Sequence, residues 1–70
     1  MEEKIIKILG GILECEVNAN TSQENTVEWD SIKQLMLVVE LESQFAVMFE
    51  PEEMERMKSV TDIVNVIKNK

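Results

Sequence analysis

Apolar residues recur at helical spacing in four segments of this chain, and this periodicity constrains the fold more than any other feature. The first segment runs from about Glu2 to Glu16, and its apolar stripe consists of Ile5, Ile6, Leu9, Ile12 and Leu13. Gly10 and Gly11 interrupt the stripe, each costing about 1 kcal/mol relative to alanine inside a helix. Close packing against a neighbour would explain them. A helix is predicted here, in an all-α fold.

The second predicted helix begins at Asp30 and Ser31, two residue types that cap helix N-termini well, and runs to about Gln44. It is apolar nearly all the way round, with Ile32, Leu35, Met36, Leu37, Val38, Val39 and Leu41. In a domain this small, such a helix must leave part of its apolar surface open or give it to a partner.

Two more helices are predicted after it. Pro51 suits the first position of a short third helix, with Glu52 and Glu53 near its positive end. The run Ser59-Val60-Thr61-Asp62 resembles a capping box that opens the last helix, whose inner face would be Val60, Ile63, Val64 and Ile67. The sequence therefore predicts a four-helix bundle with a short third helix.

A long polar stretch from Asn18 to Glu28 separates the first two helices. A loop of this length in so small a domain indicates either a function or one contact that holds it down. Val27 or Trp29 could be that anchor. For Trp29 the alternative is a side chain that faces a ligand or a partner.

Length and charge limit the class of protein. Seventy residues make a single domain, 1–70, and no apolar run approaches the roughly 18–20 residues of a membrane span. The N-terminus lacks the basic region of a secretory signal, so we expect a cytoplasmic protein. Fourteen acidic residues against seven basic ones give a net charge of −7, which argues against binding nucleic acid or an anionic membrane.

The side chains of a self-contained catalyst are missing. The chain has no His and one cysteine, Cys15, which excludes a histidine-activated nucleophile and zinc sites of the usual composition. We therefore expect a protein that is not an enzyme. Cys15 is interpreted as a small buried hydrophobe, with a reactive or intermolecular thiol as the alternative.

The segment Trp29-Asp30-Ser31-Ile32 resembles the start of the second helix in acyl carrier proteins, where an Asp-Ser-Leu motif carries the prosthetic arm on its serine. Leu41-Glu42-Ser43-Gln44-Phe45 resembles the Leu-Glu-x-x-Phe that closes this helix in the family. The resemblance covers the whole chain in length, acidity and helix order. It implies an acyl-carrier-like bundle with 4′-phosphopantetheine attached to Ser31, and with Asp30 and Ile32 completing the cofactor-binding motif.

The motif also has a physical basis. A serine at a helix N-terminus presents its hydroxyl where free backbone N–H groups and the helix dipole favour an anion such as a phosphodiester. For Ser31 the alternative is a plain N-cap worth about 1 kcal/mol. For Asp30 the choice lies between a cap, a recognition residue for the phosphopantetheinyl transferase, or both.

The chain departs from fatty-acid carriers close to this serine. Lys33 and Met36 stand where those carriers have acidic docking residues, which leaves Glu40 and Glu42 as the acids of the helix. Because charge complementarity governs which partner is accepted, the positive Lys33 should penalise partners built for an acid. Met36 and Val39 are candidates for an apolar docking patch, with core packing as the alternative.

The leading hypothesis is an acyl carrier protein for a specialised lipid, polyketide or related pathway, with Lys33, Met36, Val39 and Glu40 as partner-binding residues. Its partners would be a phosphopantetheinyl transferase and acyl-loading and acyl-processing enzymes, and we expect a monomer. The alternatives are an aminoacyl or peptidyl carrier, and an unmodified adaptor that binds through Met36, Val39 and the acidic Glu50–Glu55 stretch. A core that holds an acyl chain would be lined by Ile5, Leu9, Leu35, Leu41, Met54, Ile63 and Ile67, although ordinary packing is more economical.

Overall fold

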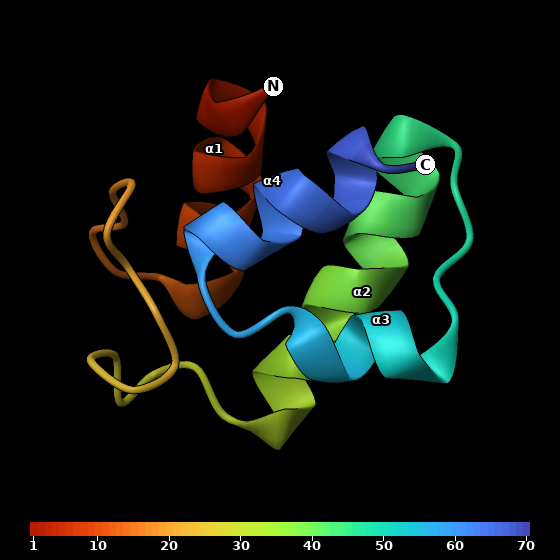
Figure 1. Ribbon diagram of the computed structural model, residues 1–70. Coiled ribbons are helices and arrows are strands. Elements are labelled where there is room, and N and C mark those ends of the chain that lie inside the picture. The colour runs from red at the N-terminus through yellow and green to blue at the C-terminus, as the bar shows by residue number, and fades with distance from the viewer.

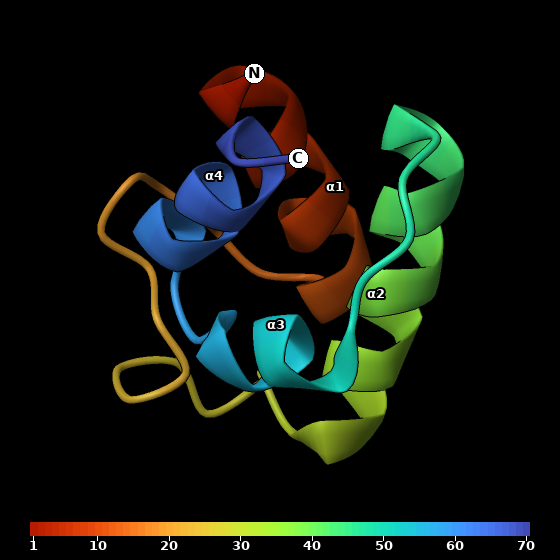
Figure 2. The same ribbon diagram turned by 45° about the vertical axis from the view of Figure 1, so that its right-hand side comes forward.

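The computed structural model describes residues 1–70 as four helices with no sheet. The helices are α1 (Glu2–Leu13), α2 (Ser31–Phe45), α3 (Pro51–Arg56) and α4 (Val60–Lys68). In Figure 1 the short α3 lies in front of α2 and below α4, and Figure 2 shows α2 running along one side of the molecule. The predicted all-α bundle, with a short third helix and a long first loop, is confirmed. None of the four helices is long and apolar enough to cross a membrane.

One core joins α1, α2 and α4. Its thirteen buried apolar side chains are Ile5, Leu9, Leu13, Trp29, Leu37, Val38, Leu41, Phe49, Met57, Val60, Ile63, Val66 and Ile67. Helix α3 contributes none of them, although Met57, directly after it, is fully buried. Within α3, Met54 is half-buried and packs against this core.

Helix α1 is shorter than predicted. It ends at Leu13 because Glu14 takes a left-handed conformation, with φ 55° and ψ 41°, and its N–H donates to the Gly10 carbonyl. The prediction that the helix reaches Glu16 is therefore wrong. Ala46 ends α2 in the same way, at φ 53°. A left-handed residue at a helix end is usually Gly or Asn, so neither end carries its usual sequence signal.

The two glycines of α1 do not mark a tight contact. A Cβ built on Gly11 would meet nothing within 4 Å, and one on Gly10 would lie 3.7 Å from the nearest atom, an ordinary contact distance. Close packing is therefore the wrong explanation, and the structure offers no packing reason for Gly11.

The long loop before α2 is held at two places. Trp29 is 4% exposed, whereas Val27 is 95% exposed, so Trp29 is the apolar anchor. Farther back, the buried Thr21 accepts a hydrogen bond from Val60 N at 3.0 Å through its carbonyl, and Gln23 N donates to the Lys58 carbonyl at 2.8 Å. These bonds join the loop to the connection between α3 and α4, and they keep its last residues in a defined position ahead of Ser31.

Candidate functional site

Ser31 is the first residue of α2 and is exposed. The helix cap is supplied by Asp30, whose Oδ1 accepts a hydrogen bond from Lys33 N at 2.9 Å. The Ser31 hydroxyl makes no hydrogen bond within the chain. The plain N-cap interpretation of Ser31 is therefore wrong, and capping is a role of Asp30. The serine hydroxyl stays available at the tip of the helix.

Two backbone donors remain unused beside that hydroxyl. Lys33 N is taken by the Asp30 side chain and Gln34 N donates to the Asp30 carbonyl at 2.9 Å, but the N–H groups of Ser31 and Ile32 have no partner in the chain. Unpaired N–H groups at the positive end of a helix favour a negatively charged group. The tip of α2 thus has both the free hydroxyl and the donors that a phosphodiester would use.

Gln34 joins three segments next to this tip, and the sequence analysis missed it. Its Oε1 accepts from Trp29 Nε1 at 2.7 Å and from Gln23 Nε2 at 3.2 Å, and its Nε2 donates to the carbonyls of Met57 at 3.1 Å and Met54 at 3.3 Å. The amide therefore ties the loop and α3 to α2. A signal was present, since Gln34 is polar and lies amid apolar residues one turn after the cap.

A shallow pocket of about 340 Å³ opens beside the serine. Its lining consists of Gln23, Trp29, Asp30, Ser31 and Gln34. The predicted motif residues Asp30 and Ser31 and the hydrogen-bonded side chains of Gln34, Gln23 and Trp29 therefore line one pocket, between the end of the loop and the first turn of α2.

Lys33 is not a freely exposed charge. Its side chain is half-buried, and its Nζ donates to the Ile12 carbonyl at 3.1 Å. That carbonyl belongs to the last turn of α1, where a positive charge is favoured by the helix dipole. Lys33 thus acts as a C-terminal cap of α1, and its role in partner binding stays a prediction.

The exposed face of α2 is apolar. Ile32, Leu35, Met36 and Val39 are between 48% and 72% exposed and follow helical spacing, so they form one stripe that starts next to Ser31. Core packing is therefore excluded for Met36 and Val39. The assignment of Leu35 to a cargo-lining core is wrong, because this side chain points away from α1 and α4 and is 66% exposed. Ile5, Leu9, Leu41 and Ile63 are fully buried as expected.

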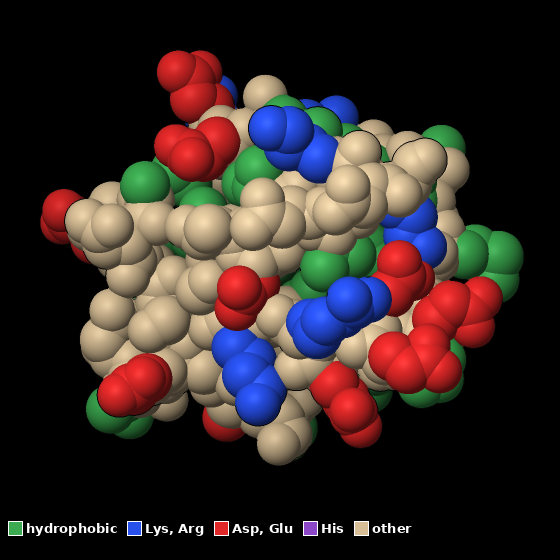
Figure 3. Space-filling model, in the orientation of Figure 1, with side chains coloured by type: hydrophobic (Ala, Val, Ile, Leu, Met, Phe, Trp, Pro, Cys, Tyr) green, Lys and Arg blue, Asp and Glu red, His purple; other side chains and the backbone are tan.

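The acids of α2 are engaged within the chain. Glu40 accepts a hydrogen bond from Gln44 Nε2 at 2.8 Å, and Glu42 accepts one from Phe49 N at 3.0 Å. Glu42 therefore holds the connection to α3. The more open acidic surface is on α3, where carboxylates gather on the face shown in Figure 3. It belongs to the Glu50–Glu55 stretch.

Cys15 is half-buried and packs against the core. Burial and the nearby Glu28 carboxylate raise the pKa of its thiol, which disfavours the reactive thiolate at neutral pH. The interpretation of Cys15 as a small apolar residue is therefore favoured over that of a reactive thiol.

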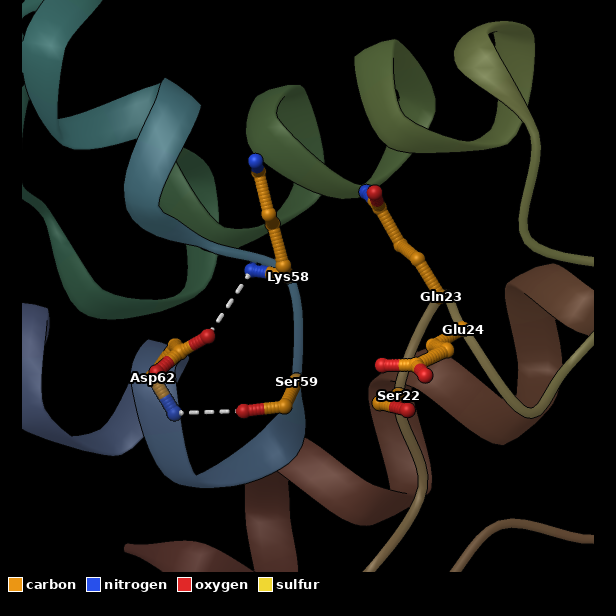
Figure 4. A pocket seen from close by; sticks show the side chains of 6 residues that line it. All are labelled: Ser22, Gln23, Glu24, Lys58, Ser59 and Asp62. Carbon is orange, nitrogen blue, oxygen red and sulfur yellow. Dashed lines mark hydrogen bonds between the residues drawn. The ribbon is translucent and has the colours of Figure 1, made fainter.

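A second polar pocket, of about 490 Å³, lies at the start of α4 and is drawn in Figure 4. Ser59 Oγ accepts from Asp62 N at 3.0 Å, and the Asp62 carboxylate accepts from Lys58 N at 3.3 Å instead of from Ser59 N. Only the first half of the predicted capping box is therefore present. The pocket does not include Ser31.

Of the comparisons with known proteins, the one with solved structures found a match. Neither a family model nor a curated protein matches the sequence. Among solved structures, the chain is similar to "a putative acyl carrier protein" from Mycobacterium tuberculosis, with a TM-score of 0.85 and 26% sequence identity. The match covers 97% of this chain and 95% of that chain. The chain has the acyl carrier protein fold. The resemblance found in the sequence is thereby confirmed at the level of the fold.

Proposed function

We propose that this protein is an acyl carrier that holds its cargo on a 4′-phosphopantetheine arm attached to Ser31. The observation that supports this most is the free, exposed Ser31 hydroxyl at the tip of α2 in an acyl carrier protein fold. When bound, the arm supplies a thiol that carries the acyl group as a thioester.

The residues present fit such an arm. Ser31 Oγ would hold the arm as a phosphodiester, with adenosine 3′,5′-bisphosphate leaving from coenzyme A and the hydroxyl proton passing to a base of the transferase. The N–H groups of Ser31 and Ile32, which have no partner in the chain, would stabilise this phosphodiester. Asp30 holds the first turn of α2 in place through Lys33 N, which positions these donors.

The partners follow from the function. A phosphopantetheinyl transferase must load Ser31, and acyl-loading and acyl-processing enzymes must reach the arm. We place their docking surface on the exposed stripe of α2, which contains Met36 and Val39. The carrier is proposed to work as a cytoplasmic monomer in a specialised lipid, polyketide or related pathway, without catalytic residues of its own.

The second candidate function is an unmodified adaptor. The exposed stripe of α2 and the acidic surface of α3 would serve an adaptor equally well, since neither requires an arm. An aminoacyl or peptidyl carrier remains the alternative within the carrier class, because Ser31 would hold any of these cargoes in the same way.

Intact mass separates the carrier from the adaptor. After incubation with coenzyme A and a broad-specificity transferase, the chain should gain the mass of one arm, and Ser31→Ala should abolish the gain completely. Ser43→Ala is the matched control, because Ser43 is an exposed serine of the same helix and should load normally. A gain that survives Ser31→Ala, or no gain with several transferases, would contradict the carrier function.

A further inference from the structure

The pocket beside Ser31 has a shape and lining that the attachment chemistry alone does not require. It is bounded by the loop on one side and by the first turn of α2 on the other. Its volume of about 340 Å³ is at the small end of the roughly 300–1,000 Å³ of ligand pockets. Trp29 is its only apolar lining residue. A group that settles here must therefore combine several polar atoms with a small apolar part.

We propose that this pocket receives the phosphopantetheine arm itself, so that the loaded arm lies against the loop and α2 instead of extending into solvent. The inference rests on the proposed function and adds a binding site on this chain for the arm. The arm consists of a phosphodiester, a carbon with two methyl groups, a hydroxyl and two secondary amides. Its polar groups match the polar lining residues of the pocket, and its two methyl groups match the single apolar one, Trp29.

Gln23 is the residue with unused hydrogen-bonding capacity toward the arm. Its Nε2 donates one hydrogen bond, to Gln34 Oε1, which leaves its second N–H and its oxygen without a partner. One free donor beside one free acceptor is the complement of a secondary amide. Gln34 is different, because all of its amide positions are taken. It positions Gln23 and Trp29 instead of contacting the arm through a free group.

Trp29 supplies the apolar contact. Its indole N–H is held by Gln34 Oε1 at 2.7 Å, which fixes the orientation of the ring. The side chain is 4% exposed, so a small part of it lines the pocket, two residues before Ser31. A fixed aromatic surface loses little conformational freedom when a methyl group packs on it. The two methyl groups of the arm are the part closest to the phosphodiester apart from one carbon, and they would reach this ring first.

The pocket at the start of α4 is a poorer host. It has no apolar side chain to contact the methyl groups of the arm. Charge does not separate the two pockets, since Glu24, Asp62 and Lys58 together carry a net charge of −1 here and Asp30 carries −1 beside Ser31. Figure 4 shows the Gln23 side chain leaving this pocket and pointing toward α2, while Glu24 and Ser22 stay behind. The carboxamide of Gln23 is thus directed to the side of the loop where Ser31 lies.

NMR spectroscopy of the loaded chain tests the inference. Trp29 is the only tryptophan, so its indole signals are unambiguous. We expect nuclear Overhauser effects between the methyl protons of the arm and the Trp29 ring, and a shift of the Gln23 side-chain amide on loading. Gln23→Ala removes one hydrogen-bonding group and should lower the ratio of docked to extended arm about fivefold. Glu24→Ala is the control and should leave it unchanged, because Glu24 lines only the other pocket.

The possible outcomes test the docked arm separately from the proposed carrier function. A chain that gains the mass of the arm but shows no contact between the arm and Trp29, or whose contact is insensitive to Gln23→Ala, overturns the docked arm and leaves the carrier function intact. A chain that gains no mass overturns the carrier function, and the docked arm with it.

Discussion

Helices α2 and α4 use their apolar residues in opposite ways. In α4, Val60, Ile63, Val66 and Ile67 are all buried and Val64 is half-buried, so every apolar side chain serves the core. In α2, Leu37, Val38 and Leu41 are buried, while Ile32, Leu35, Met36 and Val39 stand on the open side. One helix has a single apolar face and the other has two.

The difference shows which apolar side chains stabilise the fold and which do not. A buried apolar side chain stabilises the fold by about 1.5–3 kcal/mol, whereas an exposed one contributes little and lowers solubility. The second apolar face of α2 therefore contributes little to holding this bundle together. It begins beside Ser31, which is why we assign it to partner enzymes that must approach the arm.

The largest expected effect is on the buried face of α2. Leu37→Ala should cost about 2–5 kcal/mol, because the fully buried side chain leaves a cavity. A chain of this length has only about 4–10 kcal/mol in total. Leu35→Ala, on the open face, should stay within about 0.5 kcal/mol. Urea unfolding followed by circular dichroism measures both. If both variants lost the same free energy of unfolding, Leu35 would be as important for the fold as Leu37, and α2 would not differ from α4.

Partner docking should depend on the open face. Leu35→Asp should raise the KM for transferase loading about tenfold, or about 1.4 kcal/mol, because a carboxylate is forced into an apolar contact. The value of kcat should stay unchanged, since Ser31 is untouched. Thr61→Asp places the same charge on the exposed side of α4 and should have no effect. Equal KM values for both variants would remove the functional difference between the two helices.

Gln34 tests whether α2 also holds the loop and α3. Gln34→Ala leaves the indole N–H of the buried Trp29 without its partner, which should cost about 1 kcal/mol or slightly more in the free energy of unfolding. It should also change the Trp29 fluorescence. Gln44→Ala is the matched control, since its Nε2 bonds only to the exposed end of Glu40. A Gln34 variant as stable as this control would show that the network is dispensable.

The smallest effect concerns the end of α4. Lys70 Nζ donates to Glu53 Oε1 at 2.6 Å, and Glu50 N donates to the same atom at 2.8 Å. The bond from Glu50 first, and then Lys70, lower the pKa of Glu53 below its ordinary value. Glu53 therefore adds stability above its unfolded-state pKa, and this stability is lost as pH falls through the lowered folded-state pKa.

Glu53→Gln should thus be less stable than the parent chain at neutral pH, with the difference shrinking as pH falls below about 4.5. Unfolding measured at several pH values follows this change. Glu55→Gln, at an exposed glutamate of the same helix, is the control and should be as stable as the parent chain at neutral pH. A difference that stays constant with pH would show that the contact between α3 and the end of α4 does not depend on the charge of Glu53.

Helix starts could be predicted from the sequence, and so could the end of α2 to within one residue, but the end of α1 could not. Asp30, Pro51 and Ser59 mark starts because a cap acts within three residues of itself. Glu14 and Ala46 end their helices in a left-handed conformation without the usual glycine, so the residue type gives no signal at either end. The candidate site also has one residue that the sequence predicted and one that it did not. Ser31 could be found from its motif, whereas Gln34 shows only as a polar residue amid apolar ones, and its bonding partners are carbonyls 20 and 23 residues away.

For α2, the sequence predicts the start of the helix but not the side that is buried. The sequence alone was enough to place Ser31 at the tip of an apolar helix, because caps and periodicity are local, and the family resemblance implied the acyl-carrier-like bundle. It could not say which side of α2 would face outward, since both sides are apolar and periodicity cannot rank them. Packing of α1 and α4 on one side settled this, burying Leu37 and Leu41 and leaving Leu35 in solvent. The same packing brought Lys33 Nζ to the Ile12 carbonyl at the end of α1.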